Sequence, residues 1–213
     1  MRKYWIGGLL LVLFMSGIAA ADVINSTAGK TIDVYLPGPA FLPGPGTYST
    51  VAIGAHPAWQ PNFGSDAYWI SYADTGYQGV VFQPYHGTNV VATVTDTFTA
   101  SAGEYLKMKV WSDDTAGVWL DGVLLWGPVF TQSTCSGQPI GCVPGDYKAF
   151  NLLMTSTGTH TLQFDMYQVG TGTDTTSNPF GLLYTGAVPE PASMLLLGSG
   201  LFGLAAMRRK LKK

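Results

Sequence analysis

The sequence predicts an all-β protein, in which an antiparallel β-sandwich of jelly-roll type lies between an apolar segment at each end. From residue 31 onward, short runs rich in Val, Ile, Thr, Tyr, Phe and Trp alternate with clusters of Gly, Pro, Asn and Asp, a pattern typical of successive strands and turns. No run of helical length in this body has a 3.6-residue apolar repeat. We therefore divide the chain into residues 1–21, a β-sandwich domain over 22–187 and a tail over 188–213.

The first 21 residues have the three parts of a secretory signal peptide. Arg2 and Lys3 precede an apolar run over residues 4–15, and small residues then lead to Ala21. The run is short for a retained membrane anchor, and an Ala-x-Ala pattern follows it. We expect the secretion machinery to export the chain and signal peptidase to cut after Ala21.

Ten strand regions are expected in the body, because each is short, rich in β-formers and bounded by turn residues. They cover residues 31–36, 48–53, 67–72, 79–83, 90–100, 104–111, 117–120 with 123–126, 147–154, 159–169 and 180–187. Residues 90–99 and 161–167 alternate one apolar face with one polar face. Such alternation is typical of antiparallel sandwich sheets, and so many strands without helices favour two packed sheets.

Residues 106–126 read as a strand, an acidic turn at Asp113 and Asp114, a second strand, and an Asp121-Gly122 hairpin. The segment resembles part of PA14-like and galactose-binding-like β-sandwiches. That resemblance implies a calcium ion held by Asp113 and Asp114 that contacts sugar hydroxyls, and paired carboxylates suit this cation. The alternative is that both side chains simply cap the turn with hydrogen bonds.

Residues 55–72 are rich in aromatic side chains and also resemble galactose-binding-like domains. Because exposed aromatic rings stack on sugars, Trp59, Tyr68 and Tyr77 are candidates for a carbohydrate-binding platform. The alternative for each is packing in the core, which we favour for Trp69 beside Ile70.

The two cysteines, Cys135 and Cys142, enclose a six-residue segment in a chain that leaves the cytoplasm. An intramolecular disulfide is the natural interpretation in an oxidising compartment. Closing so short a loop would contribute about 2 to 3 kcal/mol, so the bond would hold a loop rather than the whole fold.

The charge of the body argues against several partners. Residues 22–187 contain four lysines and twelve acidic residues, a net charge of −8, which disfavours nucleic acid and anionic lipid. There is no Gly-x-Ser-x-Gly elbow and no phosphate-binding glycine loop. Glu104 is the only glutamate of the body, which disfavours an ordinary two-glutamate glycoside hydrolase. No enzymatic activity is predicted.

The tail again combines an apolar stretch with cations. Pro189-Glu190-Pro191 precedes residues 192–207, which are apolar, and a basic end that includes Arg208, Arg209 and Lys210. The cations stay on the cytoplasmic side of a membrane. The stretch is shorter than the about 20 residues of an ordinary transmembrane helix, so the residues alone predict a weak anchor with the body outside.

This order of parts closely resembles the PEP-CTERM sorting tail. The resemblance implies that an exosortase recognises Pro189, Glu190 and Pro191, that the inner membrane holds the chain transiently through a transmembrane sorting helix, and that the tail is removed. It also implies a Gram-negative bacterium that makes exopolysaccharide, with the body at the cell surface or in the extracellular matrix.

We therefore expect an exported, non-enzymatic protein of an exopolysaccharide or biofilm matrix, with weak carbohydrate binding. One alternative is a structural or adhesive surface protein without a small ligand, and another is a glycan-active hydrolase. No cofactor is expected apart from the calcium considered for Asp113 and Asp114.

Overall fold

A computed structural model describes residues 22–131 and 140–189. In these residues the chain forms twelve β-strands and no helix. Within the same ranges, no helix has the length and hydrophobicity that would cross a bilayer. The predicted all-β class is confirmed for the described part of the chain.

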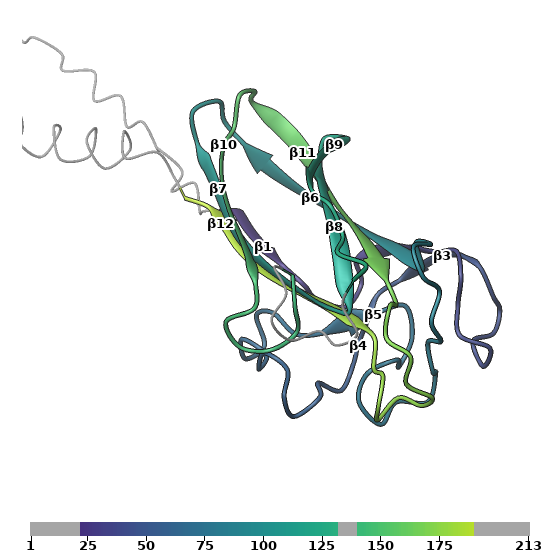
Figure 1. Cartoon of the computed structure of the whole chain (residues 1–213). Coiled ribbons are helices and arrows are strands. Elements are labelled where there is room, and N and C mark those ends of the chain that lie inside the picture. The colour runs from purple at the N-terminus through teal and green to yellow at the C-terminus, as the bar shows by residue number, and fades with distance from the viewer. Residues whose placement is uncertain (1–21, 132–139, 190–213) are drawn as a thin grey trace, which may run out of the picture.

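The strands form two antiparallel sheets that pack face to face (Figure 1). Sheet A has the order β10-β7-β12-β5-β4, and β1 pairs with β12; its strands are β1 (Asp22–Asn25), β4 (Val51–Ala52), β5 (Ile70–Ser71), β7 (Tyr105–Asp113), β10 (Lys148–Leu153) and β12 (Gly181–Val188). Sheet B has the order β3-β2-β6-β11-β8-β9; its strands are β2 (Thr31–Val34), β3 (Gly46–Ser49), β6 (Ala92–Ala100), β8 (Thr115–Leu120), β9 (Val123–Trp126) and β11 (Gly158–Tyr167).

From β5 to β12 the chain crosses from one sheet to the other at every step except the β8–β9 hairpin. The antiparallel sandwich is thus confirmed, and its finer assignment to the jelly-roll type stays a prediction. The hairpin turns at Asp121 and Gly122, whose φ angles are 50° and 77°. Positive φ at both residues is what a type I′ turn needs, so this predicted turn is confirmed.

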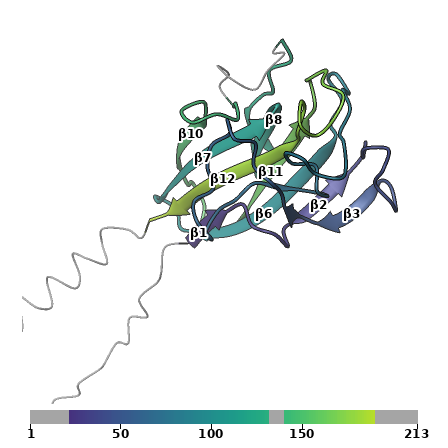
Figure 2. The same cartoon turned by 90° about the horizontal axis from the view of Figure 1, so that it is seen from below.

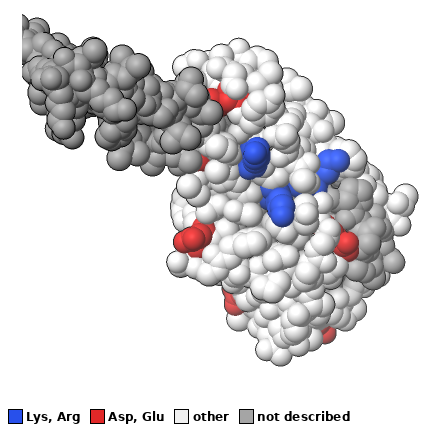
Figure 3. Space-filling model, turned by 90° about the vertical axis from the view of Figure 1, so that its left-hand side faces the viewer, with Lys and Arg blue, Asp and Glu red and all other residues white. Residues whose placement is uncertain are grey.

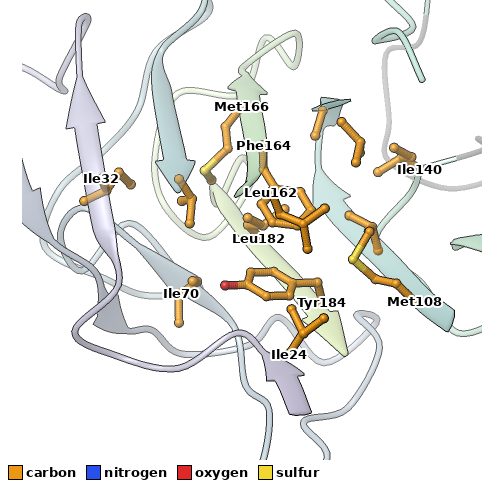
Figure 4. Close-up of a cluster of buried hydrophobic side chains, with 14 of the residues drawn as sticks. Ile24, Ile32, Ile70, Met108, Ile140, Leu162, Phe164, Met166, Leu182 and Tyr184 are labelled. Atoms are coloured by element: carbon orange, nitrogen blue, oxygen red, sulfur yellow. The ribbon is translucent and has the colours of Figure 1, made fainter. Parts of the chain in front are cut away.

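The main core lies between the sheets (Figure 4). Phe164 of sheet B stacks on Tyr184 of sheet A, with ring centroids 4.5 Å apart. The Tyr184 hydroxyl donates to Asp96 Oδ2 at 3.0 Å, and Lys30 Nζ lies 2.8 Å from Asp96 Oδ1. Burial and the Asp96 carboxylate raise the pKa of Tyr184 well above its ordinary value. A charged group is therefore accommodated in the core because two partners satisfy it.

Most strand predictions agree with the structure, but two do not. Residues 79–83 form no strand, since Gly79 N donates to Gly76 O and Val81 N donates to Asp74 O, which folds the segment into turns. Strand β1 was not predicted; it is only four residues long, too short for an alternating pattern to stand out.

Replacing Phe164 with alanine should lower the free energy of unfolding by about 3–5 kcal/mol, because the ring is fully buried and its cavity would not collapse. Thr161→Ala on the same strand is the control, since that side chain is exposed, and it should change stability by less than about 0.5 kcal/mol. Urea unfolding followed by tryptophan fluorescence measures both. Equal effects would contradict the assignment of Phe164 to the central core.

Candidate functional site

The two ends of the described body lie side by side. Strand β1 pairs antiparallel with the end of β12, so that Asp22 is opposite Val188 (Figure 2). Thr99 also fixes Asp22, because its backbone N–H and hydroxyl donate to Asp22 Oδ2 at 2.6 and 3.0 Å. Val188 is buried, whereas Pro189 is exposed. The predicted signal peptidase cut and the Pro-Glu-Pro segment therefore adjoin the same end of the sandwich.

The remaining residues of the sorting tail lie outside the described part of the chain. These are Glu190, Pro191, Arg208, Arg209 and Lys210, and the same holds for the signal peptide over residues 1–21. Pro189 alone of the Pro-Glu-Pro segment is described.

The structure places Trp59 in a second hydrophobic cluster rather than on the surface. Only 3% of Trp59 is exposed, and its ring centroid lies 4.1 Å from that of Trp69. Trp111 of β7 and Leu183 of β12 belong to the same cluster. These side chains point away from the main core, so the loop that carries Trp59 covers an apolar part of the outer face of sheet A. Trp59 consequently offers no exposed ring to a sugar, and the prediction of Trp69 in the core is confirmed.

The two tyrosines of the expected platform are held in separate places. The Tyr68 hydroxyl accepts a hydrogen bond from Ala28 N at 2.9 Å, which ties Tyr68 to the turn after β1. Tyr77 packs edge-on against His56, with ring centroids 4.8 Å apart, and His56 in turn lies 6.5 Å from Trp59. The three aromatic residues thus form no continuous exposed surface.

Asp113 and Asp114 are almost fully buried, with 4% and 3% of each residue exposed. Trp59 Nε1 donates to Asp113 Oδ2 at 2.8 Å. Asp114 Oδ2 accepts from the backbone N–H groups of Val169, at 2.7 Å, and Gly170. Burial raises the pKa of Asp113 well above 3.8, and the charge and hydrogen bond of Asp114 raise it further. These bonds agree with the structural alternative to a metal site.

A Ca²⁺ ion takes six to eight oxygen ligands, more than Asp113 and Asp114 supply. In residues 22–131 and 140–189, no three His, Cys, Asp or Glu side chains gather into a group that could hold a metal ion. One oxygen of each carboxylate already accepts hydrogen bonds. Calcium at Asp113 and Asp114 stays an untested prediction.

Cys142 is buried in the second cluster, and its carbonyl accepts a hydrogen bond from Gln60 N at 2.6 Å. Cys135 lies outside the described residues. The Cys135–Cys142 disulfide therefore stays a prediction. Cys142 connects the loop around residue 60 to the segment before β10.

Sequence reasoning missed a basic surface on sheet A. Lys107 and Lys109 occupy alternate positions of β7, and both are exposed. They line a groove of about 350 Å³, whose other lining residues are Met108, Ala149, Phe150, Asn151 and Thr185. Figure 3 shows lysines gathered on this face of the molecule. The signal was present in the sequence, because the body has only four lysines and two of them are two residues apart on a predicted strand.

Comparison with known proteins identifies the tail and leaves the body unassigned. The PEP-CTERM protein-sorting motif matches residues 187–210. No similar sequence was found among curated proteins.

Several solved structures resemble the body weakly. A family 35 carbohydrate binding module from Clostridium thermocellum is 9% identical, with 78% of this chain and 96% of that chain covered and a TM-score of 0.36. The carbohydrate-binding module CBM36 in complex with calcium and xylotriose is 10% identical over the same shares, with a TM-score of 0.30. A beta-glucosidase from Kluyveromyces marxianus is 12% identical over 47% of this chain, with a TM-score of 0.31, and the chain spans only 11% of its length. Similarities this low show neither a shared function nor a shared site.

Trp59→Phe should lower the free energy of unfolding by about 1–3 kcal/mol more than Trp111→Phe. Phenylalanine at residue 59 leaves Asp113 Oδ2 without the indole donor. Trp111 is an appropriate control, because it is buried in the same cluster and its Nε1 has no hydrogen-bond partner among the described residues. Urea unfolding of the three proteins makes the comparison, and equal losses would show that the Trp59–Asp113 bond contributes nothing.

Asp113→Asn should gain stability relative to the wild type as pH rises. The raised pKa means that the folded state holds this proton more tightly than the unfolded chain, so the wild-type residue destabilises the fold increasingly above pH 3.8. Asparagine cannot ionise and still offers an oxygen to Trp59. Unfolding free energies measured at about pH 5 and about pH 8 test this. A difference between the two proteins that does not change with pH would contradict the raised pKa.

Proposed function

We propose that this chain is an exported, non-enzymatic protein that acts outside the cell, in or on a polysaccharide matrix, after an exosortase has removed its tail. The PEP-CTERM motif indicates an exported protein that an exosortase processes at the cell envelope. The observation that carries the proposal is that this motif begins at residue 187, at the end of the last strand, β12.

The described part of the body already forms both sheets and both hydrophobic clusters. All twelve strands lie within residues 22–188, and the described members of both hydrophobic clusters lie within the same range. A folded sandwich could leave the membrane as a finished unit.

The location proposed for the mature protein follows from both ends. Signal peptidase would cut after Ala21, and exosortase would recognise Pro189, Glu190 and Pro191 while the inner membrane holds the chain. The body would then remain at the surface or enter the extracellular matrix of a Gram-negative bacterium. Weak binding to exopolysaccharide would keep it there.

The roles of the carboxylates support a protein without catalysis. Glu104 Oε2 accepts from the backbone N–H of Ser101 at 2.6 Å, as a turn residue commonly does. Asp165 accepts from Thr93 and Trp119 at 2.8 and 2.7 Å, and Asp96 is bonded to Lys30 and Tyr184. These acids stabilise the fold, which leaves them poorly suited to act as a general acid or base.

The double substitution Pro189→Ala with Glu190→Ala should keep the tail on the protein. In a host with an active exosortase, wild-type protein should shorten at its C-terminus and leave the membrane fraction, whereas the variant should stay at full length in that fraction. Pro189 is exposed beyond the last strand, so the body should be unaffected. Mass spectrometry of the purified proteins identifies the C-terminus.

Pro45→Ala, in an exposed loop, is the matched control and should be processed like the wild type. Normal processing of the Pro189 and Glu190 variant, or an unchanged wild-type tail in the presence of exosortase, would overturn the proposal.

A further inference from the structure

The outer face of sheet A carries a regular arrangement of lysines beside small residues. Two rows cross the sheet: Ala149, Lys109, Thr185 and Asn25 in one, and Asn151, Lys107, Ala187 and Val23 in the next. Each row contains one long cationic side chain flanked by short ones. The groove of about 350 Å³ lies where the short side chains leave space beside the lysines.

The positive charge of this face is not neutralised by the protein. Within the described residues, Lys107, Lys109 and Lys148 form no salt bridge, whereas Lys30, the fourth lysine of the body, pairs with Asp96. Of the strands around the groove, β7, β10 and β12, only β7 contains an acidic residue, Asp113 at its end, and that side chain is buried. On the outer face of sheet A, Lys107 and Lys109 therefore remain available to an anionic partner.

An aromatic ring holds one of the ammonium groups of the groove. Lys109 Nζ lies 4.4 Å from the centre of the Tyr147 ring, whereas Lys148 lies outside the groove, with its Nζ 3.4 Å from the centre of the Trp126 ring of sheet B. Such contacts fix a cation without cancelling its charge. Lys107 and Lys109 repeat at about 6.8 Å along β7, so the face presents its charges in a line.

The uncharged groups of the groove suit a hydroxylated ligand. The exposed Asn151 side chain makes no hydrogen bond to another described residue, and the Thr185 hydroxyl donates to Asn25 Oδ1 at 2.9 Å, which leaves its lone pairs and the Asn25 amide available. Donors and acceptors of this kind match sugar hydroxyls. The combination of aligned cations with neutral amides and hydroxyls matches a sugar chain that carries carboxylates.

We propose that the groove around Lys107 and Lys109 binds a carboxylate-bearing polysaccharide, with the ammonium groups on the carboxylates and Asn151 and Thr185 on the hydroxyls. This inference rests on the proposed function, because it needs the body to lie outside the cell. An anionic membrane surface fits the arrangement less well. Lys107 and Lys109 line a groove rather than a protruding apolar tip.

The test uses the full-length protein in non-ionic detergent, passed over immobilised polygalacturonate and over neutral dextran. The wild type should be retained on polygalacturonate alone, and raising NaCl from about 50 mM to about 500 mM should release it. Lys107→Gln combined with Lys109→Gln should weaken retention at least about tenfold, whereas Lys107→Arg combined with Lys109→Arg should largely keep it. Lys30→Gln removes a lysine outside the groove; it should lower stability, because Asp96 loses a partner, but the folded variant should bind like the wild type.

The proposal would be overturned if the glutamine variant and the wild type were retained equally on polygalacturonate, or if the wild type were retained equally on dextran and on polygalacturonate. It would also be overturned if the glutamine variant lost binding to phosphatidylglycerol vesicles but kept binding to polygalacturonate. Thermal unfolding of each variant checks that the body is folded, and the arginine variant separates a lost charge from a lost fold. Removal of the tail by exosortase is measured in a separate experiment. If the groove does not bind polygalacturonate, the proposal that the chain is sorted still stands. If the tail is not removed, the binding measurement can still be interpreted.

Discussion

Strand β12 is hydrogen-bonded along both edges, to β7 on one side and to β1 and β5 on the other. Its side chains alternate between the two hydrophobic clusters, with Leu182 and Tyr184 in the main core and Leu183 in the second. Because Tyr184 also reaches Asp96 of sheet B, one strand links the two sheets and the covering loops. The last strand of the body to be synthesised thus completes both clusters, and the sandwich can close only when the chain is available up to Val188.

The sequence predicted those features that local pattern controls. Alternation in β6 and β11, and the positive φ angles that Asp121-Gly122 favours, depend on neighbouring residues alone. The burial of Trp59 could not be predicted this way. Trp59 is buried because its loop packs on Trp111 and Leu183, two apolar side chains on the outer face of sheet A. Likewise, Lys107 and Lys109 line a groove together with Ala149 and Thr185, short residues on strands distant in sequence.

The net charge of the body gives an incomplete view of its surface. Four of its twelve acidic residues, Asp96, Asp113, Asp114 and Asp165, are buried, and Asp113 holds its proton more tightly than an exposed aspartate does. Lys107 and Lys109, by contrast, are exposed on the outer face of sheet A, and Figure 3 shows lysines gathered on this side of the molecule. The composition of the whole body therefore argues against anionic partners, whereas the local surface around Lys107 and Lys109 favours an anionic partner.

The pairing of Asp22 with Val188 has a consequence for survival outside the cell. Exopeptidases begin at chain ends, and loose ends are where proteolysis usually starts. In this body, the residue that follows the expected signal peptide and the residue that precedes the Pro-Glu-Pro segment are partners in one ladder. A protein trimmed close to both positions would present almost no free end to an exopeptidase, and digestion from either end would first have to break that ladder.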